Sequence, residues 1–351
     1  MTAIEKGKDI LAVSKVLDEK FSTKDHPAHN TLVRLGGKST VKKVPVIATG
    51  IPTFDYDTLQ FGGIPRGRIV ELYGPESAGK TTTALSIIAE AQKAGDVPTF
   101  VDAEHALDPT YAEKLGVNLD NLFLSQPNSG EEALQTVDSL VDSGASALIV
   151  IDSVSALVPE AELAGDIGDA HVGLQARMMS QAMRILTGKA SRNGVTLIFL
   201  NQLREKIGVM YGDPETTSGG RALKFYASLR VNITRKEAIW EGTKENIIGH
   251  KINLWAKKNK GGIPFRRTEV SFIYPGNGRV AGFDRVDDMI TYASKHGLFE
   301  VSGSWYSIDG TKVANGLLNL KTYLRGEPKA IEALQKKVEE FVKKQEEVQS
   351  V

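Results

Sequence analysis

The stretch Gly74–Thr81, GPESAGKT, has the spacing G-x-x-x-x-G-K-[ST], which is typical of a loop that binds nucleotide phosphates. The apolar run IVELY precedes it and the helical pattern TTTALSIIAEAQKA follows it, as such a loop requires. Its glycines let backbone amides face phosphate oxygens, and the helix N-terminus adds partial positive charge. We expect Lys80 to reach the β- and γ-phosphates and Thr81 to bind Mg²⁺. The predicted nucleotide-binding residues of this loop are Gly74, Pro75, Glu76, Ser77, Ala78, Gly79, Lys80, Thr81 and Thr82.

Four further side chains could complete this chemistry, and each has a plainer alternative. Asp152 ends the apolar run ALIVID and fits a Walker B acid that holds Mg²⁺ through water, or it caps the next turn. Glu104 follows another strand and could orient the attacking water, or form a surface ion pair. Gln202 could sense a γ-phosphate or simply end its strand, and Tyr111 could stack on a base or pack under a helix. The set indicates a Mg²⁺-dependent NTPase, without choosing among kinases, motors and switches.

The elements that must position these residues follow a regular alternation. From Arg68 onward, short Val/Ile/Leu-rich runs alternate with helical patterns, which predicts a mostly parallel sheet flanked by helices. Near residue 280 the pattern changes to helices, a hairpin around Asp309-Gly310 and a final helix. We therefore predict an α/β fold with an N-terminal helix–strand arm (1–45), an NTPase core (46–280) and a small α+β C-terminal domain with a helical tail (281–351). The final helix should place on one face Ile331, Leu334, Val338, Phe341 and Val342.

Composition excludes some classes of protein. The 351 residues hold 43 Lys+Arg and 43 Asp+Glu, so net charge gives no sign of a polyanionic partner. There is no cysteine, which excludes disulfides and thiolate metal sites. No apolar stretch approaches the length of a signal sequence or membrane span, so we expect a cytoplasmic protein with no membrane partner. One local exception is His250–Arg267, with six Lys/Arg and no Asp/Glu.

Several stretches then indicate a family. The connection within NQLREKIGVMYGDPETTSGGRALKFY is too long for a structureless loop unless it is functional or disordered. Together with GPESAGKTT, VDAEHALDPTYAEKLGV, GDIGDAHVGLQARMMSQAMR and KKNKGGIPF, it closely resembles the RecA family of bacterial DNA recombinases. We predict that this connection is disordered without DNA. The resemblance runs from about Leu32 to about Arg325 and implies a RecA-type P-loop fold.

The resemblance implies roles for matching residues. Lys80 and Thr81 would bind ATP and Mg²⁺, Glu104 would be the catalytic base, and Gln202 would couple the γ-phosphate to DNA binding. Asp108 and Tyr111 would lie against the adenine.

RecA proteins polymerise with ATP between subunits. The family pattern implies that Lys258 and Lys260 reach the neighbour's phosphates, although from composition alone this segment looked like a solvated basic strand edge. Phe225 would lie at the subunit interface, and the amphipathic segment Lys8–Phe21 would dock on the adjacent subunit.

DNA contacts are implied for two loops, the first over Glu162–Val172 and the second in the long stretch quoted above. Glycine amides and hydroxyls suit phosphates, aliphatic side chains can wedge between bases, and Arg and Lys add sequence-independent affinity. We expect little sequence specificity. The residues expected to contact DNA are Val172, Arg177, Ser180, Arg184, Arg204, Lys206, Ile207, Gly219 and Gly220.

The chain departs from the family pattern at four places. Val172 replaces a methionine, which puts its wedge role in doubt. FDYDTLQFGG replaces LDxALGxGG and is one residue longer, and GGIPF follows KNK in place of apolar and small residues, which should loosen that segment. The tail mixes Lys and Glu where many RecA proteins are acidic, so restraint on duplex access should be weak.

The sequence therefore predicts an ATP-dependent recombinase that forms helical filaments on single-stranded DNA and pairs it with double-stranded DNA. Promotion of self-cleavage of a LexA-like repressor is a further expected role. The alternatives are a RecA-fold ring motor of the helicase type, a nucleotide-gated filament that recruits a partner without strand exchange, and, least of all, a small-molecule kinase.

Overall fold

The structure, a computed structural model, describes residues 12–13, 15–17, 44–166, 169, 171, 173–205, 215–242, 246–276, 281–308 and 310–349. The chain forms two compact units, Met1–Pro45 and Val46–Val351. In the first unit, residues 12–13 and 15–17 are helical, and the rest of the expected helix Lys8–Phe21 lies outside the described residues. Among the described residues, none of the helices is both long and apolar enough to cross a membrane.

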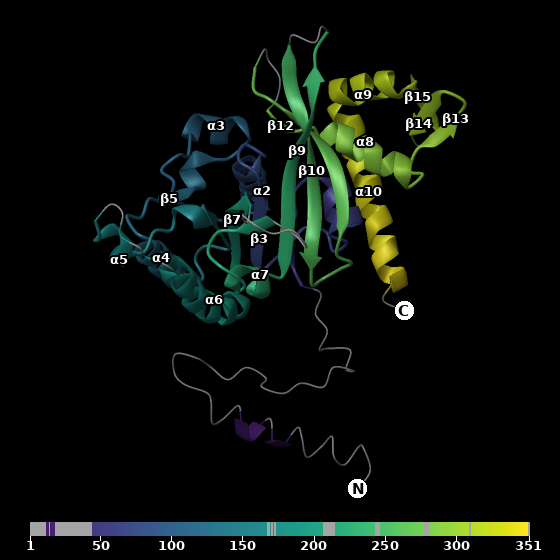
Figure 1. The fold of residues 1–351 in the computed structure, drawn as a ribbon. Coiled ribbons are helices and arrows are strands. Elements are labelled where there is room, and N and C mark those ends of the chain that lie inside the picture. Colours follow the sequence, from purple (N-terminus) through teal and green to yellow (C-terminus); the bar gives the residue numbers. More distant parts are fainter. Residues whose placement is uncertain are drawn as a thin grey trace. The chain divides into compact units, whose positions relative to one another are not determined.

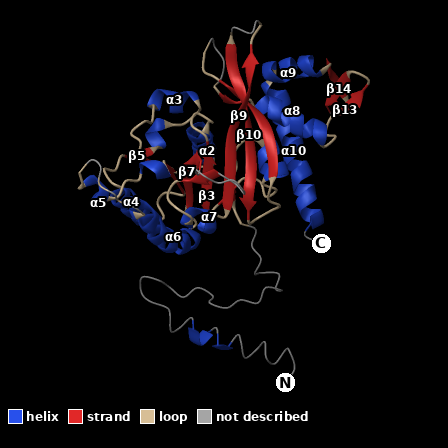
Figure 2. Cartoon of the chain, in the orientation of Figure 1, coloured by secondary structure: helices blue, strands red, loops and turns tan. Residues whose placement is uncertain are grey.

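A large mixed sheet dominates the second unit, in the order β12-β11-β10-β9-β3-β7-β6-β4-β5 (Figures 1 and 2). The parallel part comprises β9 (Leu229–Trp240), β3 (Ile69–Gly74), β7 (Thr196–Glu205), β6 (Leu148–Asp152), β4 (Thr99–Asp102) and β5 (Phe123–Ser125). The antiparallel part adds β10 (Ile247–Asn259), β11 (Arg266–Ile273) and β12 (Gly282–Phe283). A separate two-stranded sheet joins β1 (Val46–Ile47) to β2 (Ile64–Pro65). The predicted fold class is confirmed.

Both faces of the parallel strands are buried. Along β6, Leu148 and Val150 belong to one apolar cluster, whereas Ile149 and Ile151 belong to another. Because alternate side chains of a strand point to opposite faces, apolar layers must cover the sheet on both sides. The helices of this part are α2 (Lys80–Lys93), α3 (Pro109–Lys114), α4 (Gly130–Ser143), α5 (Glu160–Leu163), α6 (Leu174–Asn193) and α7 (Ala222–Tyr226), with short turns η2 (Leu119–Asn121) and η3 (Val154–Ala156).

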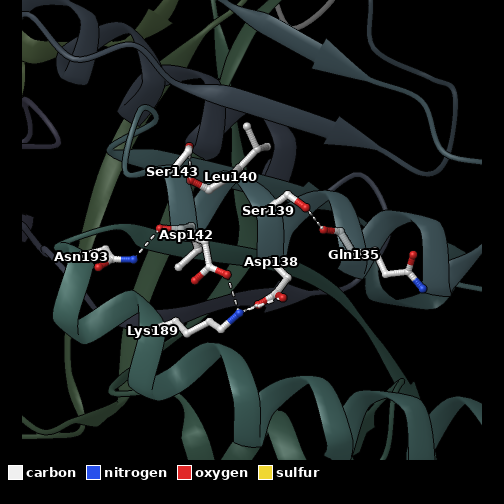
Figure 3. A network of polar contacts seen from close by, with 9 residues as sticks. Gln135, Asp138, Ser139, Leu140, Asp142, Ser143, Lys189 and Asn193 are labelled. Carbon is white, nitrogen blue, oxygen red and sulfur yellow. Dashed lines mark hydrogen bonds and ion pairs between the residues drawn. The ribbon is translucent and has the colours of Figure 1, made fainter. Parts of the chain in front are cut away.

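Polar contacts tie α6 to α4 (Figure 3). Lys189 Nζ lies 2.8 Å from Asp138 Oδ1 and 2.6 Å from Asp142 Oδ2, and these acids raise the pKa of the lysine. Asn193 Nδ2 donates to the Val141 carbonyl at 2.7 Å. Such exposed ion pairs add little stability individually. Together, the ion pairs and the Asn193 hydrogen bond connect α4 to α6, the helix that carries the arginines expected to contact DNA.

The long connection after Asn201 has more regular structure than the sequence indicated. β7 continues to Glu205 and pairs antiparallel with β8 (Glu215–Thr217), with Leu203 opposite Thr217. The hairpin therefore pairs backbone groups in part of a stretch that the sequence indicated to be a loop. Residues 206–214 lie outside the described residues, so the predicted disorder of this loop without DNA stays a prediction.

The C-terminal elements have their own apolar cluster, which includes Leu334 and Val338. They are α8 (Arg285–Lys295), the three-stranded sheet β13 (Glu300–Ser302), β14 (Trp305–Ile308) and β15 (Thr311–Asn315), then α9 (Leu317–Gly326) and α10 (Pro328–Gln349). The expected hairpin is present as β14–β15, and the apolar face predicted for the last helix packs against this cluster. In Figure 1 these elements lie on the opposite side of β9–β11 from α4–α6. The domain boundary expected near residue 280 stays a prediction.

The one-residue-longer segment FDYDTLQFGG contains a π-helix, η1 (Thr53–Thr58). A π-turn takes one residue more than an α-turn, so it can absorb an extra residue. After it, Gln60 has φ +74°, a left-handed conformation that costs a non-glycine residue about 1–2 kcal/mol. η1 also contacts the end of α8. The Asp57 carboxylate lies 2.8 Å from Lys295 Nζ and 2.8 Å from Nε2 of His296, the residue after that helix.

Candidate nucleotide-binding site

The phosphate-binding loop joins β3 to α2, as predicted. A Cβ at Gly74 would lie 2.0 Å from the Ile233 carbonyl oxygen, so only glycine fits there. Gly79, at φ +94°, turns the chain into α2. Lys80 Nζ donates to the carbonyls of Pro75 at 2.7 Å and Gly74 at 3.2 Å, and therefore lies across the loop. Burial lowers the pKa of Lys80, while the nearby acids Asp152 and Glu104 oppose that shift.

Thr81 and Asp152 meet beside this loop. Thr81 Oγ1 donates to Asp152 Oδ2 at 2.7 Å, and Asp152 ends β6 with its side chain buried. Burial raises the pKa of Asp152 to about 6, although the Thr81 hydrogen bond partly opposes this. A hydroxyl and a carboxylate next to a phosphate-binding loop are the oxygen ligands that Mg²⁺ prefers, so these residues fit the ion.

A second polar group gathers at the carboxyl ends of β4, β6 and β7. Gln202 Nε2 donates to Glu104 Oε1 at 3.3 Å, and Ser153 Oγ donates to the same oxygen. Parallel strands place their carboxyl ends at one edge of the sheet, where ligands of such folds bind. Glu104 is exposed, so water can reach it. Ser153 was missed from the sequence, where it reads as an ordinary turn residue after the strand.

A pocket of about 320 Å³ opens in front of the loop. Its lining residues are Ser77, Ala78, Gly79, Lys80, Thr81, Thr82, Tyr111, Arg235, His250, Ile252, Phe272 and Tyr274. Tyr111 lies 2.9 Å from Thr82 Oγ1 through its hydroxyl, and burial raises its pKa. Asp108 does not line this pocket. It caps α3 by accepting from the amides of Thr110 and Tyr111 at 2.8 and 3.2 Å, and so orients the tyrosine.

The far wall of the pocket was missed from the sequence. Arg235 Nη2 donates to the Tyr274 hydroxyl at 2.9 Å, and that hydroxyl lies 2.6 Å from His250 Nδ1. Burial and the nearby Arg235 charge lower the pKa of His250, which favours the neutral ring. These residues come from β9, β10 and the end of β11. Only antiparallel register brings them together, and no local motif marks them.

A buried charged group joins the phosphate-loop strand to the base of the second loop. Glu71 on β3 is fully buried and pairs with Arg230 on β9. Asn201 Nδ2 donates to Glu71 Oε1 at 2.9 Å and to the Ser218 carbonyl at 3.1 Å. No local pattern in the sequence marks this group either, since its members stand on separate strands.

The two lysines of KNK lie at the end of β10. Lys258 Nζ donates to the carbonyls of Lys224 and Phe225, both at 2.8 Å, and therefore closes the end of α7. Burial lowers the pKa of Lys258, and the charges of Lys260 and Arg230 act in the same direction. Lys260 is exposed, and Phe225 is 71% exposed although it is a large apolar residue.

The residues expected to contact DNA differ in exposure, and some lie outside the described residues. Arg177 and Arg184 are exposed on α6, and their spacing of seven residues puts them on one helix face. Ser180 Oγ donates to its own helix at Ala176 O, 2.7 Å away.

The two glycines of the second loop pack against this same region. A Cβ at Gly219 would meet Val154 Cγ1 at 2.7 Å, and one at Gly220 would meet Ala176 Cβ at 2.9 Å. Arg204 lies on β7, but its side chain, like all of Val172, Lys206 and Ile207, lies outside the described residues.

Comparison with known proteins shows the family to which the chain belongs. The RecA N-terminal domain model matches residues 15–279 and the RecA C-terminal domain model matches residues 287–343. The chain is 48% identical to Protein RecA of Azospirillum lipoferum over 332 residues, which is 94% of this chain and 90% of that protein. It is 50% identical to Protein RecA of Rhodospirillum centenum over 308 residues, covering 88% and 84% of the two chains. A solved structure of the RadB recombinase aligns with 65% of this chain and 96% of its own at 20% identity and a TM-score of 0.48. The chain therefore belongs to the RecA family of DNA recombinases, which are DNA-dependent ATPases.

Proposed function

We propose that the pocket binds ATP with Mg²⁺ and that this site drives assembly of a recombination filament. The observation that carries the proposal is the convergence of the phosphate-binding loop, the Thr81–Asp152 pair and the Glu104–Gln202–Ser153 group at one sheet edge. Thr81 would ligate Mg²⁺ directly and Asp152 would hold it through water. The ion would supply positive charge against the phosphates. Tyr111 and Tyr274 stand at the pocket end where a base would lie, with Asp108 positioning Tyr111.

Hydrolysis would depend on Glu104 as the general base. Its carboxylate already holds Gln202 and Ser153, so it is oriented towards the edge where the terminal phosphate would lie. Gln202 stands on the strand that leads into the second loop, and a change in its contact would move that strand. Asn201, next to it, joins the loop base to Glu71. This connection supports a role for Gln202 in relating nucleotide state to DNA affinity.

DNA would bind along α6 and the two loops. Arg177 and Arg184 offer charge to phosphates on one helix face, and buried hydroxyls of Thr217 and Ser218 lack hydrogen-bond partners within the described residues. These hydroxyls would reach phosphate oxygens only after the base of the loop rearranges on binding DNA. We propose single-stranded DNA as the filament's track, double-stranded DNA as the second substrate and the cytoplasm as the place of action.

Residues of neighbouring subunits would complete each nucleotide site. Lys258 and Lys260 would approach the ATP of the adjacent subunit, while the exposed Phe225 and the arm 1–45 would bury apolar surface in the contact. A LexA-like repressor is a proposed further partner of the filament. A ring motor or a purely regulatory filament remains the alternative outcome of the tests.

The central test measures ATP hydrolysis with and without single-stranded DNA, alongside strand exchange. We expect strong stimulation by DNA in the wild type, and loss of both activities in Lys80→Ala because the phosphates lose their lysine. Electron microscopy with ATP and DNA should show helical filaments, whereas closed rings would favour a motor. Wild-type DNA-dependent hydrolysis in Lys80→Ala would overturn the site, and hydrolysis without strand exchange would favour the regulatory filament.

A further inference from the structure

The two internal segments that depart from the RecA pattern, FDYDTLQFGG and GGIPF, lie against each other. Gln60 Oε1 accepts from the Ile263 amide at 2.7 Å, and the Leu59 carbonyl accepts from Asn259 Nδ2 at 3.1 Å. The Asp57 carbonyl accepts from Arg266 Nη1 at 3.1 Å. We name residues 57–61 the clasp, because they hold the β10–β11 turn at its start, middle and end.

The glycines of this turn permit the close approach. A Cβ at Gly261 would lie 2.9 Å from the Phe61 ring, and one at Gly262 would lie 2.7 Å from the Leu59 carbonyl oxygen. Asn259 Oδ1 accepts from both glycine amides at 3.1 Å. From the sequence we expected these glycines to loosen the segment. In the structure these glycines let the turn be held by hydrogen bonds to Asn259 and to Gln60 of the clasp.

Lys260 stands immediately before this turn. Its amide donates to the Ser228 carbonyl at 2.9 Å, and the preceding Asn259 is buried and bound to the clasp. The backbone that carries the exposed Lys260 side chain is therefore held by the clasp, through Asn259, on one side and by Ser228, the residue before β9, on the other. Gly261 and Gly262 separate Lys260 from Ile263, but Asn259 accepts from both of their amides, so a shift of the turn should be passed on to Lys260.

Gln60 is the residue of the clasp whose side chain can be removed with little effect on the backbone. Its φ of +74° is a conformation that glycine adopts freely and glutamine does not. A glycine would leave this backbone in place but would lack the oxygen that accepts from Ile263. The side chain therefore contributes the contact with the turn, and the local backbone does not depend on it.

We propose, on the basis of the function proposed above for Lys258 and Lys260, that the clasp positions the β10–β11 turn so that Lys260 reaches the neighbouring subunit's nucleotide. Gln60 is the positioning residue, and it acts on the site of the adjacent subunit and not on its own.

The first test compares Gln60→Gly with Lys260→Ala and the wild type in DNA-stimulated ATP hydrolysis. Gln60→Gly should unfold close to the wild-type temperature, because relief of the strain at residue 60 offsets the lost hydrogen bond. Its DNA-stimulated rate should fall about threefold or more, the effect of one lost hydrogen bond on a positioned group. Gln60→Glu keeps an acceptor oxygen and should keep most of the rate.

A second variant leaves Gln60 unchanged and alters the turn. Gly262→Ala should lower the rate similarly, because its Cβ would push the turn from Leu59. Gly326→Ala is the matched control, since a Cβ there meets nothing within 4 Å.

The deciding test mixes subunits. Gln60→Gly is assembled with excess Glu104→Gln, which has an intact clasp but should not hydrolyse ATP. Hydrolysis per Gln60→Gly subunit should then rise towards the wild-type value, because Glu104→Gln neighbours supply a well-placed Lys260. Wild type diluted in the same way should keep its rate per active subunit.

The outcomes separate the two levels of proposal. A wild-type rate in Lys260→Ala would overturn the proposed function of that lysine. A low rate in Lys260→Ala with a wild-type rate in Gln60→Gly would overturn the clasp alone. A low rate in Gln60→Gly that mixing does not restore would show that the clasp serves its own subunit, which also overturns the proposal.

Discussion

At the scale of single residues, Glu71 is a buried charged side chain that belongs to no sequence motif and that should matter for stability. It is fully buried between Arg230 and Asn201, on the strand that leads into the phosphate-binding loop. An ion pair in such a position is expensive to break from one side, because the remaining charge keeps its burial and loses its partner.

We therefore expect Glu71→Gln to lower the free energy of unfolding by about 3 kcal/mol, measured by urea denaturation. The matched control is Asp142→Asn, whose carboxylate pairs with Lys189 but is 50% exposed. That change should alter stability by less than about 1 kcal/mol, since exposed pairs contribute little. Equal losses in the two variants would contradict the importance given to burial.

At the scale of elements, α6 is the helix on which the proposed contacts with DNA phosphates depend. The helix is held to α4 through Lys189 and Asn193, so its outer face is fixed relative to the sheet (Figure 3). Arg177 and Arg184 stand on that face, whereas Arg192 stands in the last turn.

Replacing Arg177 and Arg184 with Gln should weaken single-strand binding and reduce its dependence on salt. Each lost phosphate contact should lower the slope of log affinity against log salt concentration by about 0.7, because fewer counterions are released. Arg192→Gln, on the same helix but away from the loops, should leave the slope as it is. An unchanged slope in the double variant would count against α6 as the DNA-binding helix.

At the scale of the whole molecule, buried carboxyl groups link stability to pH. Asp55 in η1 is wholly buried, and burial raises its pKa from 3.8 to about 8. Burial likewise raises the pKa of Asp288 in α8 from 3.8 to about 6. The folded state holds these protons more tightly than the unfolded chain does. The stability they contribute is full below about pH 4 and is lost as pH rises through the folded-state values.

The free energy of unfolding should therefore fall between pH 5 and 8, by at most about 1.4 kcal/mol per pH unit for each proton released. Asp55→Asn resembles the protonated acid, and its amide can donate to Thr49 Oγ1, which lies 2.7 Å from the carboxylate oxygen. Its stability should depend less on pH over this range than that of the wild type. Parallel pH profiles for the two proteins, from thermal or urea unfolding, would show that Asp55 does not titrate as inferred.

The sequence by itself determined the features that local pattern encodes. The phosphate-binding loop, the acid that ends β6, the parallel strands and the last helix all depend on residues close together in the chain, and each was found where expected. The lengthening of FDYDTLQFGG was visible too, but its conformation as a π-helix was not.

Only the tertiary structure decided which distant side chains meet. Arg235, His250 and Tyr274 line one wall because β9, β10 and β11 pair antiparallel, and Glu71 meets Arg230 because β3 and β9 are neighbours in the sheet. Gln60 meets Ile263 because a turn and a loop about 200 residues apart pack together. Such contacts arise from strand pairing and close packing, which no short stretch of sequence specifies, because the partners are separated along the chain by whole secondary-structure elements.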